Sequence, residues 1–239
     1  MRKVISYCIW GDNKLYNYGV YENALLFNKI YPDWYMVVYY TKTAIVKVID
    51  ELKKIKNVRC NLVDFPNHPR NSMLRFLAGF NKNNDVVIFR DADSRLIQRE
   101  ADAVKEWLDN TNKSIHIMRD KETHKKICAG LFGVRNRVMC NKDIIAKYYE
   151  YFDLLDSKWT IDEKFLNQVI YPKYINDATI HAEFNRDEPN ATGFPNHCVS
   201  REVDGFCGMT QGKTLNAFKQ FNEVVVVHKK ERCLWNGES

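Results

Sequence analysis

The chain has 239 residues, of which 45% are hydrophobic and 13% aromatic, and its formal net charge is +6. This length can bury a large core as one domain or two closely packed ones, and the composition excludes an intrinsically disordered chain. The basic residues are dispersed along the sequence, which argues against a nucleic-acid partner. A mild positive balance suits a small anionic ligand such as a nucleotide.

The first residues lead directly into an apolar strand that is too short for a signal peptide. No segment approaches the ~18 apolar residues of a membrane span. The cysteine count is 7, an odd number, and no Cys-x-x-Cys pair occurs, which is typical of free thiols in a reducing compartment. We therefore expect a soluble, cytoplasmic protein that is not secreted and has no membrane span.

Strands and helices are predicted to alternate along the first part of the chain. Strands are expected at 4–10, 34–41, 58–63 and 85–90, and helices at 18–29, 43–56 and 71–80. This order predicts an α/β protein with a mostly parallel central sheet flanked by helices and joined by right-handed crossovers. We expect residues 1–95 to form a Rossmann-like nucleotide-binding half.

The second part of the chain has a different pattern. Two strands, 114–118 and 130–134, have no full helix between them, and helices are expected at 99–110, 143–155 and 160–170. Residues 185–212 are rich in Gly, Asn and Pro and are expected to be irregular, and a last strand is expected at 223–228. We expect residues 96–239 to form a substrate-binding half, packed with the first half as a single domain over 1–239.

The most informative motif is an apolar strand that leads into two carboxylates. The run 86–89, Val-Val-Ile-Phe, is typical of a strand buried on both faces. Asp91 and Asp93 follow at the carboxyl end of this strand, where open α/β sheets bind ligands. Paired carboxylates favour a divalent cation such as Mg²⁺ or Mn²⁺, which often shares its ligands with substrate phosphates. The alternative is a solvated turn in which Asp91 caps the following helix.

Together, the motifs of the chain resemble those of glycosyltransferases of the GT-A type, and in particular the small glycosyltransferase domains of large DNA viruses and some bacteria. The resemblance extends to about residue 170 and is carried by 31–34, 73–76, 90–95, 99–100, 116–120 and 129–133. It implies a GT-A fold and a metal-dependent transfer of a sugar from a nucleoside diphosphate sugar, expected to be a UDP-sugar. The acceptor would be a hydroxyl of a glycan or glycoprotein.

The resemblance also implies a metal site. Asp91 and Asp93 would hold Mn²⁺ or Mg²⁺ against the donor diphosphate, and the ion would stabilise the leaving group as a Lewis acid. His228, at the end of a run of valines, is the expected third ligand, and a surface histidine is the alternative. Some relatives have Lys-Pro-Trp after this histidine; here Lys229 and Lys230 follow, and either could make the contact to the phosphate instead.

The nucleotide and sugar would lie beside this metal site. Trp10 or Tyr16 would stack on the base, Gly11 would let the backbone approach the ligand, and Arg75 would face the donor. The alternatives are core aromatic residues and an exposed helix arginine. The full set implied for donor binding is Tyr7, Trp10, Gly11, Tyr16, Arg75, Asp91, Ala92, Asp93 and Gly130, with Gly130 leaving room for the sugar.

Three further residues are implied in catalysis. Arg119 and Asp120 would line the sugar pocket, unless they form a structural ion pair. Asp162 would orient the acceptor hydroxyl or act as a general base. The alternative for the segment around Asp162 is a capping box between Thr160 and Glu163.

Two other function classes compete with this hypothesis. One is another metal-dependent phosphate enzyme, such as a nucleotidyltransferase or phosphohydrolase. Phosphatases with an Asp-x-Asp pair usually have it after their first strand, and the turn at Gly11 lacks the Gly- and Arg-rich loop of nucleotidyltransferases. The other is a non-catalytic module that binds a nucleotide sugar or glycan without turnover.

Overall fold

The computed structural model of the chain describes residues 1–154, 160–195 and 205–210. Within them, an eight-stranded sheet has the order β3-β2-β1-β4-β6-β5-β7-β8. The strands are β1 (Lys3–Ile9), β2 (Tyr35–Tyr40), β3 (Val58–Leu62), β4 (Val86–Phe89), β5 (Ile115–Arg119), β6 (Phe132–Arg135), β7 (Ala178–Ala182) and β8 (Ala191–Thr192). β6 is antiparallel to β4 and β5, and the other pairs are parallel, which confirms the mostly parallel sheet.

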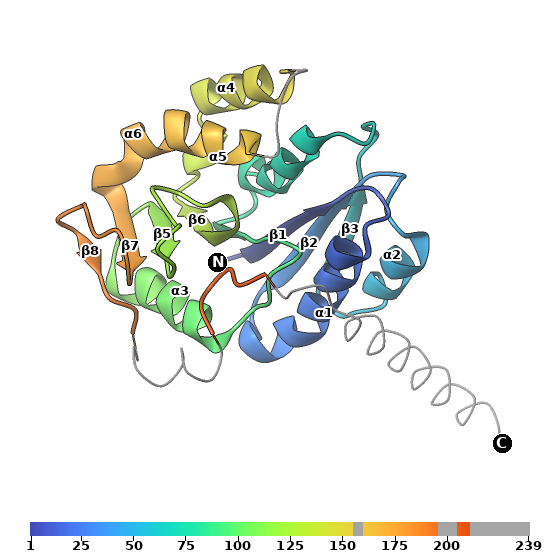
Figure 1. Cartoon of the computed structure of the whole chain (residues 1–239), viewed down its shortest axis with the longest axis horizontal. Coiled ribbons are helices and arrows are strands. Elements are labelled where there is room, and N and C mark those ends of the chain that lie inside the picture. Colours follow the sequence, from blue (N-terminus) through green and yellow to red (C-terminus); the bar gives the residue numbers. More distant parts are fainter. Residues whose placement is uncertain (155–159, 196–204, 211–239) are drawn as a thin grey trace.

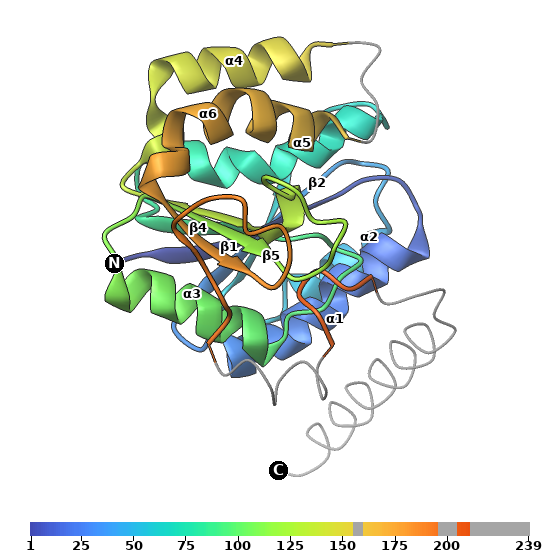
Figure 2. The same cartoon turned by 60° about the vertical axis from the view of Figure 1, so that its left-hand side comes forward.

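Helices cover both faces of this sheet, as Figures 1 and 2 show. One face carries α1 (Lys14–Ile30), α2 (Val46–Leu52) and α3 (Gln98–Asn110). The other carries the 3-10 helix η1 (Pro69–Phe80), α4 (Lys142–Phe152), and a continuous helix made of α5 (Ile161–Phe165), the π-helical η4 (Leu166–Ile170) and α6 (Tyr171–Tyr174). Short 3-10 turns are η2 (Ala129–Leu131), η3 (Val138–Cys140) and η5 (Ile175–Asp177).

The apolar pattern of β4 explains these three layers. Its side chains alternate between the faces, so Val87 and Phe89 join the core under η1 and α4, while Val86 and Ile88 join the core under α1 and α3. The prediction of a strand buried on both faces is therefore confirmed. At roughly 25 cal/mol per Å² of buried apolar surface, burial of this strand on both faces stabilises the packing of both helical layers on the sheet.

The strand order creates a ligand-binding crevice. After β1 the chain moves outward through β2 to β3, and then returns to β4 on the opposite side of β1. This reversal is a topological switch point, where the loops after two neighbouring parallel strands diverge and leave a crevice. The loops after β1 and β4 therefore meet at the same edge of the sheet.

Several boundaries differ from the predictions. The predicted helix 71–80 is a 3-10 helix, and the predicted helix 43–56 shortens to α2. Strand β7 was not predicted, because its buried His181 interrupts an otherwise short apolar segment. The predicted strand 223–228, with His228, lies outside the described residues.

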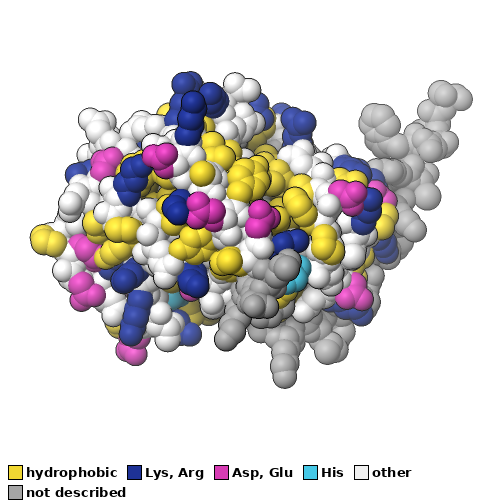
Figure 3. Space-filling model, turned by 90° about the horizontal axis from the view of Figure 1, so that it is seen from above, with side chains coloured by type: hydrophobic (Ala, Val, Ile, Leu, Met, Phe, Trp, Pro, Cys, Tyr) yellow, Lys and Arg dark blue, Asp and Glu magenta, His cyan; other side chains and the backbone are white. Residues whose placement is uncertain are grey.

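The described surface agrees with the dispersed charge of the sequence. Figure 3 shows Lys and Arg side chains interspersed with Asp and Glu over one face. In the described parts of the chain, none of the helices combines the length and apolar character needed to cross a membrane.

Two histidines are buried in the core on the α3 side of the sheet. His116 Nε2 lies 2.8 Å from His181 Nδ1, and the His116 ring stacks on Trp107. Burial lowers the pKa of His116 well below its usual value, with a further contribution from His181, and burial also lowers the pKa of His181. Burial therefore favours the neutral form of both rings in the folded state, although Glu106, 3.5 Å from His181 Nε2, opposes the lowering of the His181 pKa.

We predict that this pair makes the protein less stable in acid. The unfolded histidines take up protons below pH ~6.5, before the folded ones do, so stability is full above that pH and falls as the pH drops, by up to roughly 1.4 kcal/mol per pH unit for each ring. Denaturant unfolding at several pH values should give a shallower pH slope for the His116→Gln/His181→Asn variant than for the wild type. Equal slopes between pH 7.5 and 5.5 would contradict the prediction.

Candidate functional site

A cavity of about 540 Å³ opens at the switch point between β1 and β4. Its walls come mainly from the end of β1 and the loop after it, the start of α1, η1 and the loop before it, the loop after β4, and α5. The lining residues are Cys8, Ile9, Trp10, Gly11, Asp12, Asn13, Tyr16, Asn67, His68, Pro69, Ser72, Arg75, Asp91, Ala92, Asp93, Ala129, Thr160, Asp162, Glu163 and Thr210. Seven of the residues predicted for donor binding are thus brought together, along with Asp162.

Asp91 and Asp93 lie in a loop that does not cap the next helix. Helix α3 begins at Gln98, its N-cap is Ile97, and no side chain makes a capping hydrogen bond there. The capped-turn alternative is therefore wrong, and both carboxylates line the cavity instead.

The side of α1 holds this loop in place. Asn23 is fully buried; its Nδ2 donates to Ser94 O at 2.7 Å, and its Oδ1 accepts from Leu96 N at 3.0 Å. Gly19, one turn earlier on α1, has no room for a side chain, because a Cβ would lie 2.1 Å from Ala92 O. Helix and loop therefore pack backbone to backbone beside the carboxylates.

A buried arginine joins the two acidic walls of the cavity. The Arg75 side chain is only 8% exposed; its Nη1 is paired with Asp91 Oδ1, and its Nη2 lies 3.4 Å from Asp162 Oδ2. Backbone oxygens of Ser72 and Arg90 accept from the same guanidinium at 2.9 and 3.3 Å. Arg75 is thus not an exposed helix arginine but the cation that compensates both carboxylates.

Burial and mutual repulsion disfavour ionisation of the other acids. The pKa of Asp93 is raised by burial and by the Asp91 charge. Burial also raises the pKa of Asp162, despite the opposing effect of Arg75, and the pKa of Glu163, to which Asp162 and Asp91 add. Carboxylic acids with raised pKa values in a cavity are candidates for proton transfer or cation binding.

The donor set of the cavity fits a hard divalent cation. Asp91 and Asp93 supply carboxylate oxygens within one cavity, and their repulsion would be relieved by a cation. Within residues 1–154, 160–195 and 205–210, no group of three or more His, Cys, Asp or Glu side chains is arranged to hold a metal. Two carboxylates are sufficient for Mg²⁺, which usually keeps waters and substrate phosphates as its other ligands.

Gly130 belongs to the site for a reason that differs from the prediction. A Cβ on Gly130 would lie 2.0 Å from Asp91 Oδ2, so the glycine makes room for the carboxylate. It does not itself line the cavity. The close approach fixes Asp91 against the η2 turn.

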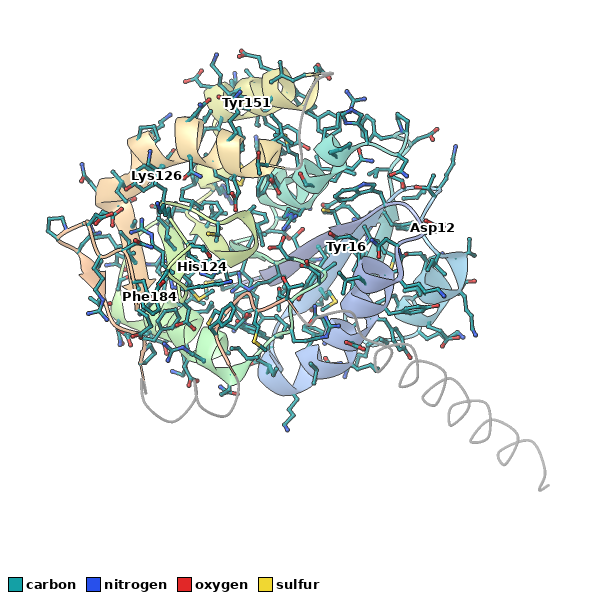
Figure 4. The ribbon with its side chains drawn as sticks, viewed as in Figure 1. Asp12, Tyr16, His124, Lys126, Tyr151 and Phe184 are labelled. Carbon is teal, nitrogen blue, oxygen red and sulfur yellow. The ribbon has the colours of Figure 1, made fainter. Side chains whose placement is uncertain are left out.

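The opposite wall is formed by the loop after β1. Gly11 has a φ of +67°, which favours glycine, and its N–H donates to Thr43 Oγ1 at 2.8 Å. Asn17 Nδ2 donates to Gly11 O at 3.0 Å, while its Oδ1 accepts from Ile45 N. These bonds hold Trp10 and Tyr16 at the cavity, and Figure 4 shows Tyr16 with Asp12 on the α1 side of the molecule.

Three predicted site residues lie elsewhere. Tyr7 is fully buried in the core under α1 and does not line the cavity, because the cavity reaches only the last two residues of β1, Cys8 and Ile9. Arg119 and Asp120 are also buried and do not line the cavity.

Arg119 and Asp120 do form structural ion pairs, but not with each other. Arg119 is paired with Glu188 through contacts of 2.6 and 2.7 Å. Asp120 accepts from Arg99 at 2.8 and 3.0 Å. Arg119 and Asp120 were expected to line a sugar pocket, but they are buried in these ion pairs and do not line the cavity.

Several residues that line the cavity were not predicted from the sequence. Thr160 makes no capping hydrogen bond, so the capping-box alternative is wrong, and Glu163 lines the cavity instead. The other polar residues not predicted are Asn13, Asn67, His68, Ser72, Thr160 and Thr210. Glu163 had a usable signal, since it follows Asp162 at the first turn of a helix, whereas the loop residues carry no periodic pattern.

No protein-family model matches the sequence, and no curated protein is significantly similar to it. Among solved structures, the chain is similar to residues 1–349 of S. aureus TarS in complex with UDP, with a TM-score of 0.50 and 10% identity, over 77% of this chain and 60% of that one. The fold is of the predicted GT-A type, with a mostly parallel central sheet flanked by helices.

Two further structures are similar over comparable lengths. A glycosyltransferase involved in glycosylation of the major capsid of PBCV-1 has a TM-score of 0.46 and 10% identity, over 76% of this chain and 82% of that one. The galactosyltransferase LgtC, in complex with donor and acceptor sugar analogs, has a TM-score of 0.46 and 12% identity, over 75% and 73%.

We predict that Arg75 is needed chiefly to compensate Asp162 and Asp91. Arg75→Met should lower the free energy of unfolding by about 3–5 kcal/mol, because a buried charge loses its partner. Adding Asp162→Asn should restore part of this loss, which a double-mutant cycle by denaturant unfolding would measure. Arg70→Met, on the same helix η1 but stacked on Phe152, is the control. Equal losses in both arginine variants without coupling to Asp162 would contradict the assignment.

Proposed function

We propose that the protein is a metal-dependent glycosyltransferase that moves a sugar from a nucleoside diphosphate sugar, expected to be a UDP-sugar, to a hydroxyl of a glycan or glycoprotein. The observation that carries the proposal is the arrangement of the switch-point cavity. Aromatic side chains line the β1 wall, two carboxylates line the β4 wall, and two more acids face them from α5. Its volume of about 540 Å³ lies within the roughly 300–1,000 Å³ typical of small-molecule sites.

The walls are suited to the three parts of such a donor. Trp10 and Tyr16 offer apolar surfaces to a base, and Gly11 allows close approach of the backbone. Asp91 and Asp93 would hold Mn²⁺ or Mg²⁺, which supplies Lewis-acid stabilisation of the departing diphosphate when bound. With the base at Trp10 and Tyr16 and the diphosphate at the metal, the sugar of the donor would lie toward α5.

The acids of α5 would act on the acceptor. Asp162 is fixed by Arg75 and by Glu163 N, which donates to its Oδ1 at 2.9 Å, so it is suited to orienting a hydroxyl. Glu163 has a raised pKa and lines the same cavity, so it is suited to exchanging a proton with that hydroxyl. Holding both substrates against these groups supplies the larger share of the rate enhancement by positioning.

We predict nucleotide binding that depends on both metal and carboxylates. In a thermal-shift panel, UDP or a UDP-sugar with Mn²⁺ should raise the unfolding midpoint by several degrees through mass action, whereas ATP and simple phosphates should not. Asp91→Asn and Asp93→Asn should each abolish the Mn²⁺-dependent shift. Asp64→Asn, a change in an exposed carboxylate paired with Lys42, should retain it. No shift with any nucleotide would overturn the proposed function.

We also predict that substitutions of the two acids on α5 lower turnover without weakening donor binding. Glu163→Gln and Asp162→Asn should lower the rate of sugar transfer or donor hydrolysis by roughly 100-fold or more, as expected for loss of a general base or an orienting group. Their affinity for UDP with Mn²⁺ should stay close to that of the wild type. Glu150→Gln, on the exposed surface of α4, is the control for both measurements. Binding without any turnover in the wild type would instead identify a non-catalytic nucleotide-sugar module.

A further inference from the structure

A short segment from late in the chain forms one edge of the cavity. Residues 205–210 reach the loop after β4, where Thr210 forms an antiparallel bridge with Ser94, directly after Asp93. Thr210 also lines the cavity. The position of this segment therefore affects both the shape of the cavity and the loop that carries the carboxylates.

The segment is held by a buried ion pair that does not line the cavity. Cys207 N donates to Asp120 Oδ2 at 2.9 Å, and both residues are fully buried. Arg99, at the start of α3, binds both Asp120 oxygens at 2.8 and 3.0 Å, and also Glu183 Oε1 at 2.8 Å. A bidentate guanidinium fixes the direction of the carboxylate, and so fixes where the Cys207 amide is held.

Apolar packing supports the same position. Cys207 belongs to a small cluster with Ala103, Met118, Leu131 and Phe194. Gly208 has a φ of +78°, and a Cβ there would lie 3.1 Å from Leu131 Cδ1, so the backbone turns close against this cluster. The Phe194 ring covers the Arg99 guanidinium at 4.2 Å.

We propose that Arg99 and Asp120 are positioning residues: their buried pair holds residues 205–210 so that Thr210 lines one edge of the donor cavity. Through the bridge between Thr210 and Ser94, the pair also steadies the loop of Asp91 and Asp93. This gives Asp120 a role in donor binding without contact with the sugar. The affinity effect rests on the proposed function, whereas the ordering of residues 205–210 does not.

The chain contains a matched control at the neighbouring position. Arg119 and Glu188 form an ion pair of the same kind, with two contacts of 2.6 and 2.7 Å, and Arg119 is as buried as Arg99. In the described residues, the other hydrogen bonds of Arg119 go to Lys126 O and Asn185 O, neither of which belongs to residues 205–210. Neutralising Asp120 or Glu188 should lower the free energy of unfolding in both cases. Only neutralising Asp120 should make residues 205–210 open more easily.

The test compares Asp120→Asn with Glu188→Gln in the full chain. Amide hydrogen exchange should be about tenfold faster at residues 205–210 in Asp120→Asn only, because local opening becomes easier. Calorimetry should show UDP with Mn²⁺ binding roughly tenfold more weakly to Asp120→Asn, with near wild-type affinity for Glu188→Gln. Exchange at 205–210 that is unchanged, or changed equally in both variants, would overturn the proposal.

A second variant keeps the test decisive if Asp120→Asn does not fold. Gly208→Ala strains the segment at a left-handed position and leaves the Arg99–Asp120 pair intact. It should reproduce the faster exchange and the weaker UDP binding with little change in exchange elsewhere, and wild-type behaviour in both would count against the proposal. If the wild type binds no UDP with Mn²⁺, the proposed function fails, and hydrogen exchange alone decides the role of the pair.

Discussion

The site depends on one buried cation between two acids that are distant in the sequence. Arg75 reaches Asp91, after β4, and Asp162, on α5, and it is itself held by backbone oxygens of Ser72 and Arg90. Without the guanidinium, two carboxylates would face each other across a partly buried cavity, which costs several kcal/mol per ion. The ion pair therefore lets the two halves of the chain meet around a negatively charged site.

The loop of Asp91 is held in place by close backbone packing at two glycines and by hydrogen bonds from one buried amide. Gly130 lets the η2 turn approach Asp91, and Gly19 lets α1 approach Ala92 O. Buried Asn23 then hydrogen-bonds the same loop through both ends of its amide. Carboxylates that sit on packed backbone rather than on a free loop are pre-organised for a ligand.

Much of the fold, and the carboxylate motif of the site, follow from local sequence patterns. The apolar run of β4 and the position of Asp91 and Asp93 after it depend on neighbours in sequence, so they are predictable. The partners of Arg119 and Asp120 are not, because Glu188 and Arg99 lie 69 and 21 residues away and only the folded sheet brings them close. Tyr7 shows a second limit: the cavity begins one residue further along β1, at Cys8, and no local pattern marks that boundary.

The helix that carries Asp162 contains a π-helical turn. The number of residues in this turn therefore determines which way the acids of α5 point. Residues Leu166–Ile170 are π-helical, while the flanking α5 and α6 are α-helical. Asn167, in this turn, hydrogen-bonds both the N–H and the carbonyl of Ile127. Deleting one residue here would rotate α5 by about 100° relative to α6, swinging its acids away from the cavity. A homologue with an ordinary α-helix would thus need a gap inside a helix to align, which a simple residue-by-residue comparison would miss.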